Sequence, residues 1–166
     1  MKKKHILLAF IMLLSFPKLN AQSNNLERKF KDIEQKVIDW RRDIHQNPEL
    51  GNREFRTATL VAKHLQSLGI EVQTKVGITG VVGVLKGGQP GPVVALRADM
   101  DALPMPENNP ELAYKTTTNF AHMCGHDGHM TIICGLGEKL AENWIFIDML
   151  HFLKMQGHDI LDSLAA

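Results

Sequence analysis

A dense group of potential metal ligands stands at residues 121–129, which read Ala-His-Met-Cys-Gly-His-Asp-Gly-His. Within nine residues it contains one thiol, three imidazoles and one carboxylic acid, together with two glycines that let the backbone bend. Thiolate and imidazole groups are ligands for zinc and related transition metals. An isolated cysteine or histidine usually has no such role, so it is the density of the cluster that predicts metal binding.

Spacing favours Cys124 and His126 as the ligand pair. Residues two apart point the same way on an extended segment and nearly opposite ways on a helix, so this pair requires a loop or strand end, which Gly125 permits. A rival pair, His122 and His126, would share a helix face, but it lacks the Glu of the His-Glu-x-x-His motif, and its glycines weaken a helix. A structural zinc site would add His122 and His129 to the favoured pair, and their crowding makes one tetrahedral site awkward.

Two carboxylates form a second candidate group. The apolar run at 93–96 predicts a strand covered on both faces, and Asp99 and Asp101 follow it directly. Being two apart, they would share a face beyond the carboxyl end of the strand, where open α/β sheets usually bind ligands. They could instead be solvated turn residues, but the Cys/His cluster nearby favours a role in the site.

The first 21 residues have the layout of a secretory signal peptide. Lysines at 2–4 precede an apolar run at 6–14, and Ala21 provides a small residue before Gln22. We expect cleavage after Ala21 and an exported protein, either periplasmic or secreted, with an uncleaved anchor as the alternative. The apolar run is too short to span a bilayer as a helix, so no stable membrane span is expected after processing. Removing the leader leaves 15 basic against 18 acidic residues, which suggests no nucleic-acid partner.

The chain contains two cysteines, Cys124 and Cys134. Export would permit a disulfide between them. Cys134, however, ends the apolar run Ile-Ile-Cys, which predicts a buried core thiol. We therefore expect two free thiols, with a disulfide as the minority alternative.

Apolar periodicity predicts the elements that must position these groups. In chain order they are helices at 26–44 and 54–68, strands at 70–73, 81–85 and 93–96, a Pro-rich loop at 102–121 and a helix at 132–140. Asn47-Pro48 should end the first helix and Gly69 the second, whereas Asp127 could cap the start of the third. The inward positions expected in the second helix are Phe55, Ala58, Ala62 and Leu65. This pattern predicts one domain of the α/β class.

Four ordered segments resemble the motifs of the bacterial and plant N-acyl-amino-acid amidohydrolases. This group includes hippurate hydrolases and auxin-conjugate hydrolases, and it lies within the aminoacylase and carboxypeptidase superfamily of metallopeptidases. The segments are residues 41–50, 79–83, 96–104 and 124–129. The resemblance implies an α/β catalytic domain of the two-metal zinc-peptidase type with a smaller inserted domain, often used for homo-oligomer formation.

The resemblance also implies roles for particular residues. Cys124 and His126 would be ligands of a two-metal centre of Mn, Zn, Co or Ni, with the thiolate able to bridge both ions. Asp101 would orient a metal-binding side chain without binding the metal itself, which is a common supporting role. The ions would activate a water and polarise an amide carbonyl. The substrate would be an N-acyl amino acid or small peptide, and the products a carboxylic acid and a free amino acid.

The match stops near residue 143. Residues 22–143 are similar to the N-terminal part of the catalytic domain, which in the family continues to a Gln-Pro-Ala-Glu-Glu segment carrying the general base and a further ligand. This chain has no Glu-Glu pair and an unmatched tail at 144–166. We therefore expect a truncated copy, from a frameshift, a shortened gene or a faulty gene model. Without the base it should be inactive alone, and the alternative is a non-catalytic fragment that binds metal weakly or not at all.

Two expectations concern the tail itself. Its apolar residues at three-residue spacing predict a short helix that covers the exposed sheet: Trp144, Ile147, Leu150 and Leu153. Its histidines, His151 and His158, lie outside every matched motif, and we expect no role in metal binding for either.

Overall fold

The computed structural model describes residues 27–28, 30–88, 90–142 and 150–154. The chain divides into two compact units, Met1–Gln35 and Lys36–Ala166. The predicted signal peptide lies outside the described residues. Within the described ranges, no helix is both long enough and apolar enough to cross a membrane.

The first predicted helix is shorter than expected. α2 spans Glu34–Gln46, and a turn at residues 32–33 interrupts the periodic pattern that suggested a start at 26. Its end is as predicted, directly before Asn47-Pro48. The Asn47 side chain donates a hydrogen bond to the backbone oxygen of Asp43 at 2.8 Å, which satisfies one of the last helix carbonyls.

The second predicted helix is confirmed as α3, Phe55–Ser67. Gly69 follows it with a φ of +74° and donates its N–H to the Gln66 oxygen at 3.0 Å, so it serves as the predicted cap. Phe55 was expected to point inward, but it is 60% exposed. The buried stripe of α3 centres on Val61 and Leu65, and Phe55 lies at its edge.

The three predicted strands are confirmed, and a fourth is added. β1 is Glu71–Val76, β2 is Gly80–Leu85, β3 is Val94–Arg97 and β4 is Leu150–Lys154. The sheet order is β1-β2-β4-β3, in which only the β3–β4 pair is parallel. The covering helix predicted for the tail is therefore wrong at 150–153, and residues 143–149 are outside the described part. A short apolar run does not distinguish helix from strand, and here the backbone pairs with β2 and β3 on both sides.

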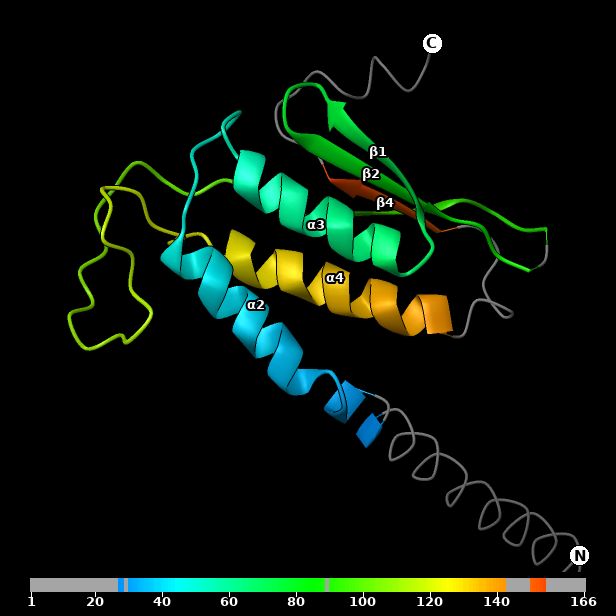
Figure 1. The fold of residues 1–166 in the computed structure, drawn as a ribbon, viewed down its shortest axis with the longest axis horizontal. Helices are drawn as coiled ribbons and strands as arrows, with labels where there is room; N and C mark the ends of the chain where they lie inside the picture. The colour runs from blue at the N-terminus through cyan, green and yellow to red at the C-terminus, as the bar shows by residue number, and fades with distance from the viewer. Residues whose placement is uncertain (1–26, 29, 89, 143–149, 155–166) are drawn as a thin grey trace, which may run out of the picture. The chain divides into compact units, whose positions relative to one another are not determined.

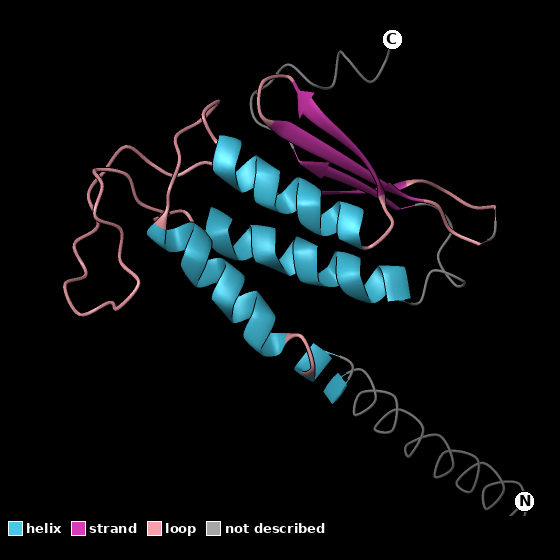
Figure 2. Ribbon diagram, in the orientation of Figure 1, coloured by secondary structure: helices cyan, strands magenta, loops and turns pink. Residues whose placement is uncertain are grey.

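α4, His126–Glu142, begins six residues earlier than the sequence predicted. It lies alongside α3 (Figures 1 and 2), and α3 contacts β1 and β2. The core between helices and sheet contains Ile44, Val61, Ala62, Leu65, Ile70, Val81, Leu85, Ala98, Met100, Met130 and Cys134. The predicted α/β class is confirmed.

The expectation that β3 is covered on both faces is wrong for the described residues. Val93 is 54% exposed and Val94 is 49% exposed. β3 is at one edge of the sheet, whereas α3 packs against β1 and β2, which lie toward the opposite edge.

Candidate metal centre

The segments that carry the candidate ligands meet at one end of the sheet, on the left in Figure 1. Leu103 and Ala121 exchange two backbone hydrogen bonds of 3.0 Å, which close the irregular 102–121 loop at its base. Ala102 also donates its N–H to the Glu49 oxygen at 2.8 Å. These bonds tie the segment after β3 to residues 121–129, the ligand run, and to the segment after α2.

His126 is held by Asp101. The Nδ1 atom of His126 lies 2.9 Å from both the carboxylate Oδ1 and the backbone oxygen of Asp101. Both oxygens are acceptors of a hydrogen bond, so Nδ1 is the donor, and in a neutral imidazole the lone pair is then on Nε2. The side chains of His126 and Asp101 are 16% and 30% exposed, so the pair borders solvent. This arrangement can present one imidazole nitrogen to a metal ion.

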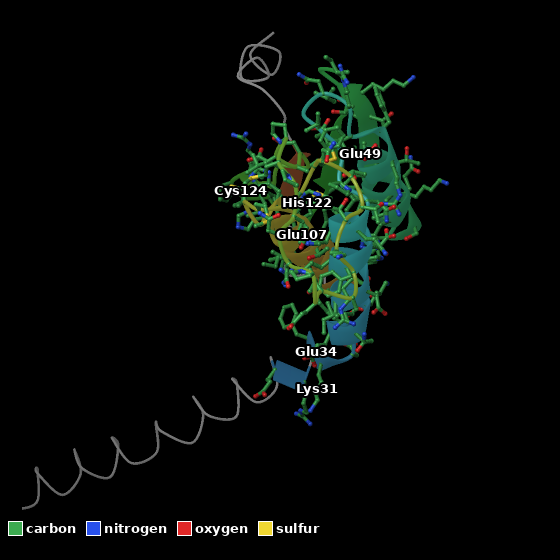
Figure 3. The ribbon with its side chains drawn as sticks, turned by 90° about the vertical axis from the view of Figure 1, so that its left-hand side faces the viewer. Lys31, Glu34, Glu49, Glu107, His122 and Cys124 are labelled. Atoms are coloured by element: carbon green, nitrogen blue, oxygen red, sulfur yellow. The ribbon has the colours of Figure 1, made fainter. Side chains whose placement is uncertain are left out.

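Cys124 lies in the turn that precedes α4 and is exposed (Figure 3). Gly125 has a φ of +80°, a conformation that glycine adopts without strain. The spacing predicted a loop or strand end for both residues. Cys124 does lie in a turn, but His126 is the first residue of α4. His122 precedes the helix, which removes the rival pair on one helix face.

The four-ligand structural zinc site is not assembled. The described residues contain no group of three or more His, Cys, Asp or Glu side chains that could hold a metal ion. His122 is only 5% exposed and its ring centre lies 6.3 Å from that of His45, whereas the ring of His129 lies 6.2 Å from that of His126.

Asp99 and Asp101 are partly buried, whereas Ala98 and Met100 on either side of Asp99 are buried. Their partners differ, however. The carboxylate of Asp99 accepts hydrogen bonds from Arg97 at 2.7 and 3.1 Å. Of the two carboxylates, Asp101 is the one that the structure joins to the ligand run.

A buried cluster that the sequence did not predict lies behind the ligand run. His45 Nδ1 is 2.9 Å from Asp127 Oδ2, and His45 Nε2 is 3.0 Å from Glu107 Oε1. The Arg41 Nε donates to the same Asp127 oxygen at 3.3 Å. The sequence allowed Asp127 as a cap of this helix, but Asp127 lies within the first turn of α4 and its carboxylate faces α2. The four-residue spacing of Arg41 and His45, which puts both on one face of α2, was the signal available in the sequence.

The pKa of the imidazole and the pKa values of the two carboxylates in this cluster shift in opposite directions. Burial alone would lower the pKa of His45, but its contacts with Glu107 and Asp127 outweigh burial and raise it. Burial would raise the pKa of Asp127 and of Glu107, but hydrogen bonds, first of all those with His45, lower both. His122 differs, because burial lowers its pKa to about 4 and leaves it neutral near pH 7.

Other residues of the matched motifs have structural partners. The Glu49 carboxylate accepts the backbone N–H groups of Arg56 at 2.9 Å and Thr57 at 2.8 Å, and so caps α3. Glu54 is fully buried and accepts a hydrogen bond from the Thr79 hydroxyl at 2.6 Å, and burial raises its pKa. These roles were also missed, because each joins residues that the sequence separates.

The cysteine expectation is confirmed. Cys124 and Cys134 do not form a disulfide, and Cys134 is buried, with 5% of its surface exposed.

Comparison with known proteins gives a family. The family model for peptidase family M20/M25/M40 matches residues 95–144. The thermostable carboxypeptidase 2 of Saccharolobus solfataricus is 45% identical over 119 residues, which are 71% of this chain and 30% of that protein. The hippurate hydrolase of Campylobacter jejuni is 47% identical over 118 residues, which are 70% of this chain and 30% of that protein. The chain thus spans about 30% of the length of these curated relatives.

A solved structure has the same fold over the shared part. The crystal structure of a Bacillus subtilis protein, described as a dinuclear metal binding peptidase from the M20 family, has a TM-score of 0.71 and 32% sequence identity. The match covers 76% of this chain and 36% of that one.

Proposed function

This chain belongs to peptidase family M20/M25/M40, and from that premise we propose that it supplies part of the active site of a metal-dependent amidohydrolase. The bond cleaved would be the amide of an N-acyl amino acid or small peptide. The relatives that support this substrate class are a hippurate hydrolase and a carboxypeptidase.

One observation carries the proposal: Asp101 holds His126 Nδ1 at 2.9 Å, two residues from the exposed thiol of Cys124. A thiolate and a neutral imidazole suit zinc and neighbouring transition metals. We propose that these two residues bind divalent ions, two in the complete enzyme, chosen from Mn, Zn, Co and Ni. When bound, the ions would supply a Lewis acid for the amide carbonyl and lower the pKa of a water. Asp101 would keep the His126 ring oriented with Nε2 toward the ions.

Cobalt titration tests the two ligands. Cobalt bound to a thiolate gives a charge-transfer absorption band, so the purified chain should develop this band on titration. Cys124→Ser should abolish the band, and Cys134→Ser should keep it because that thiol is buried in the core. A band that survives Cys124→Ser would refute the ligand assignment.

We propose that this 166-residue chain does not hydrolyse such substrates by itself. A general base contributes about 10²–10⁴ in rate. Two carboxylates near the matched motifs already have donors: Glu107 accepts bonds from His45 and the Thr116 N–H, and Glu138 accepts a 2.6 Å bond from Lys36. We therefore assign the role of general base to neither.

The test is release of glycine from hippurate with added manganese, cobalt or zinc, with Cys124→Ala as control. Turnover above about 1 s⁻¹ that the substitution abolishes would overturn the proposal of inactivity.

A second candidate function is a non-catalytic chain that binds metal weakly or not at all. The observation that favours it is the lack, among the described residues, of a group of three or more candidate ligands. Absence of the cobalt charge-transfer band at millimolar cobalt would favour this candidate over the first.

We also propose that the protein is exported, from the Lys-rich start and apolar run of residues 1–21. N-terminal sequencing of protein secreted from a bacterial host should begin at Gln22. An intact Met1 on exported protein would refute cleavage.

A further inference from the structure

Three segments of the chain converge on the ring of His45. His45 itself is in the last turn of α2, Asp127 is in the first turn of α4, and Glu107 belongs to the 102–121 loop. The imidazole bridges the two carboxylates at 2.9 and 3.0 Å. The side chains of His45, Asp127 and Glu107 are 8%, 1% and 4% exposed, so water cannot readily replace a lost partner.

Asp127 depends on this contact more than on its other charged partner. Arg41 reaches the same carboxylate oxygen, but at 3.3 Å and from a side chain that is 54% exposed. Without the His45 imidazole, two buried carboxylates would remain near each other with a donor missing from each. Leaving a buried charge without its partner is costly, so the start of α4 would shift.

The backbone connects Asp127 to the proposed ligands. Gly128 and His129 both donate their N–H groups to the Gly125 oxygen at 3.0 Å, which makes residues 125–129 one tight turn. Asp127 directly follows His126 in this turn. A change in the position of the Asp127 side chain is therefore passed to His126 and to the glycine next to Cys124.

From this geometry we infer that His45 is a positioning residue of the metal centre: by holding Asp127, it fixes the turn that presents Cys124 and His126. The inference rests on the proposed metal-binding function, because a positioning role requires a metal site. The effect of His45 on the conformation of the turn does not depend on metal. The positioning role gives the Arg41–Leu50 motif, which supplies no candidate ligand, a part in the same site.

Two substitutions separate the nitrogens of the ring. The amide nitrogen of Asn can take the place of His Nδ1, and that of Gln can take the place of His Nε2. His45→Asn therefore keeps the bond to Asp127 and gives up Glu107, whereas His45→Gln does the reverse. His64→Gln is the control, because His64 is equally buried but bonds the Cys134 backbone oxygen at 3.2 Å, away from the ligand run.

The first measurement is the cobalt affinity of each variant from its thiolate charge-transfer band. Loss of a partner that orients a metal ligand typically lowers metal affinity by about 10- to 100-fold, and we expect a fall of about 10-fold for His45→Gln. His45→Asn and His64→Gln should stay near the wild-type affinity. Equal losses in His45→Asn and His45→Gln, or an equal loss in His64→Gln, would overturn the inference.

The second measurement is amide hydrogen exchange of residues 122–130 without metal. Exchange should accelerate in His45→Gln and remain slow in His45→Asn and His64→Gln. If the wild type gives no cobalt band, the proposed function fails, and unchanged exchange in His45→Gln would separately overturn the positioning role. Should His45→Gln not fold, Asp127→Ala, which removes the acceptor altogether, should show the same faster exchange and lower affinity, and wild-type behaviour of both readouts would overturn the inference.

Discussion

Two imidazole–carboxylate contacts lie near each other and have almost the same geometry but different surroundings. His126 meets Asp101 at 2.9 Å, and His45 meets Asp127 at 2.9 Å. His126 has one nitrogen engaged and is at the border of solvent, whereas both nitrogens of His45 are engaged and its ring is buried. The second ring nitrogen of His126 can coordinate a metal ion. Both ring nitrogens of His45 contact carboxylates, so His45 can only hold those carboxylates in position. The two imidazoles thus differ in the partner of the second ring nitrogen and in burial, and these differences are the basis for proposing His126 as a metal ligand and His45 as its support.

The largest expected difference between the two contacts is in stability. Asp127→Ala should lower the free energy of unfolding by about 3–5 kcal/mol, because it leaves a buried His45 without one carboxylate. Asp101→Ala should cost no more than about 1 kcal/mol, because its side chain is 30% exposed and water can replace it. Urea unfolding followed by circular dichroism measures both. Similar losses for the two variants would remove the proposed distinction.

The order reverses for metal affinity. Asp101→Ala should weaken cobalt binding by about 10-fold or more, because His126 loses the acceptor that fixes its tautomer. Asp101→Asn retains an oxygen that can accept from Nδ1, so it should recover most of the affinity. If both variants bind cobalt as tightly as the wild type, Asp101 does not orient the ligand.

The pH dependence of stability should identify the buried contact. His45 has a pKa above its ordinary 6.5, so its contribution is complete below that value and is lost as pH rises through the folded-state pKa. Asp127 and Glu107 have pKa values below their ordinary 3.8 and 4.5, so their contributions are present above those values and are lost as pH falls. The three groups together should stabilise the fold most between about pH 4.5 and 6.5.

The matched measurement is the difference in unfolding free energy between wild type and His45→Gln across pH. The difference should be larger at pH 5.5 than at pH 8.5. A difference that grows toward alkaline pH would show that His45 is neutral in the folded protein and that the cluster is not an ionic one.

The contrast between the two contacts also shows what the sequence could reveal. The sequence could single out Cys124, His126 and Asp101 as candidates because their chemistry is concentrated in short segments beside predicted strand and helix ends, and the structure places Asp101 against His126. The His45 cluster joins residues 62 and 82 positions apart, and only the tertiary fold brings them together. Glu107, in a Pro-rich loop, had no local sign of burial.

The secondary structure, too, could be predicted from local sequence only in part. Periodicity and turn residues correctly predicted three strands and the position of α3. They failed for β4, where pairing with two neighbouring strands determined the conformation of a short apolar run. They also failed for the coverage of β3, because a continuous apolar run does not state what packs against it.

The smallest expected effect belongs to Asp99, the neighbour of Asp101 on the same segment. Its carboxylate bonds Arg97, whose side chain is 57% exposed, and surface ion pairs of this kind contribute about 0–1 kcal/mol. Asp99→Asn should therefore change the unfolding free energy by less than about 0.5 kcal/mol and leave cobalt affinity unchanged. This variant is the matched control for Asp101→Asn, since both remove one negative charge within two residues of each other. A loss of cobalt affinity in Asp99→Asn equal to that in Asp101→Ala would mean that the charge of the segment, and not the contact with His126, determines metal binding.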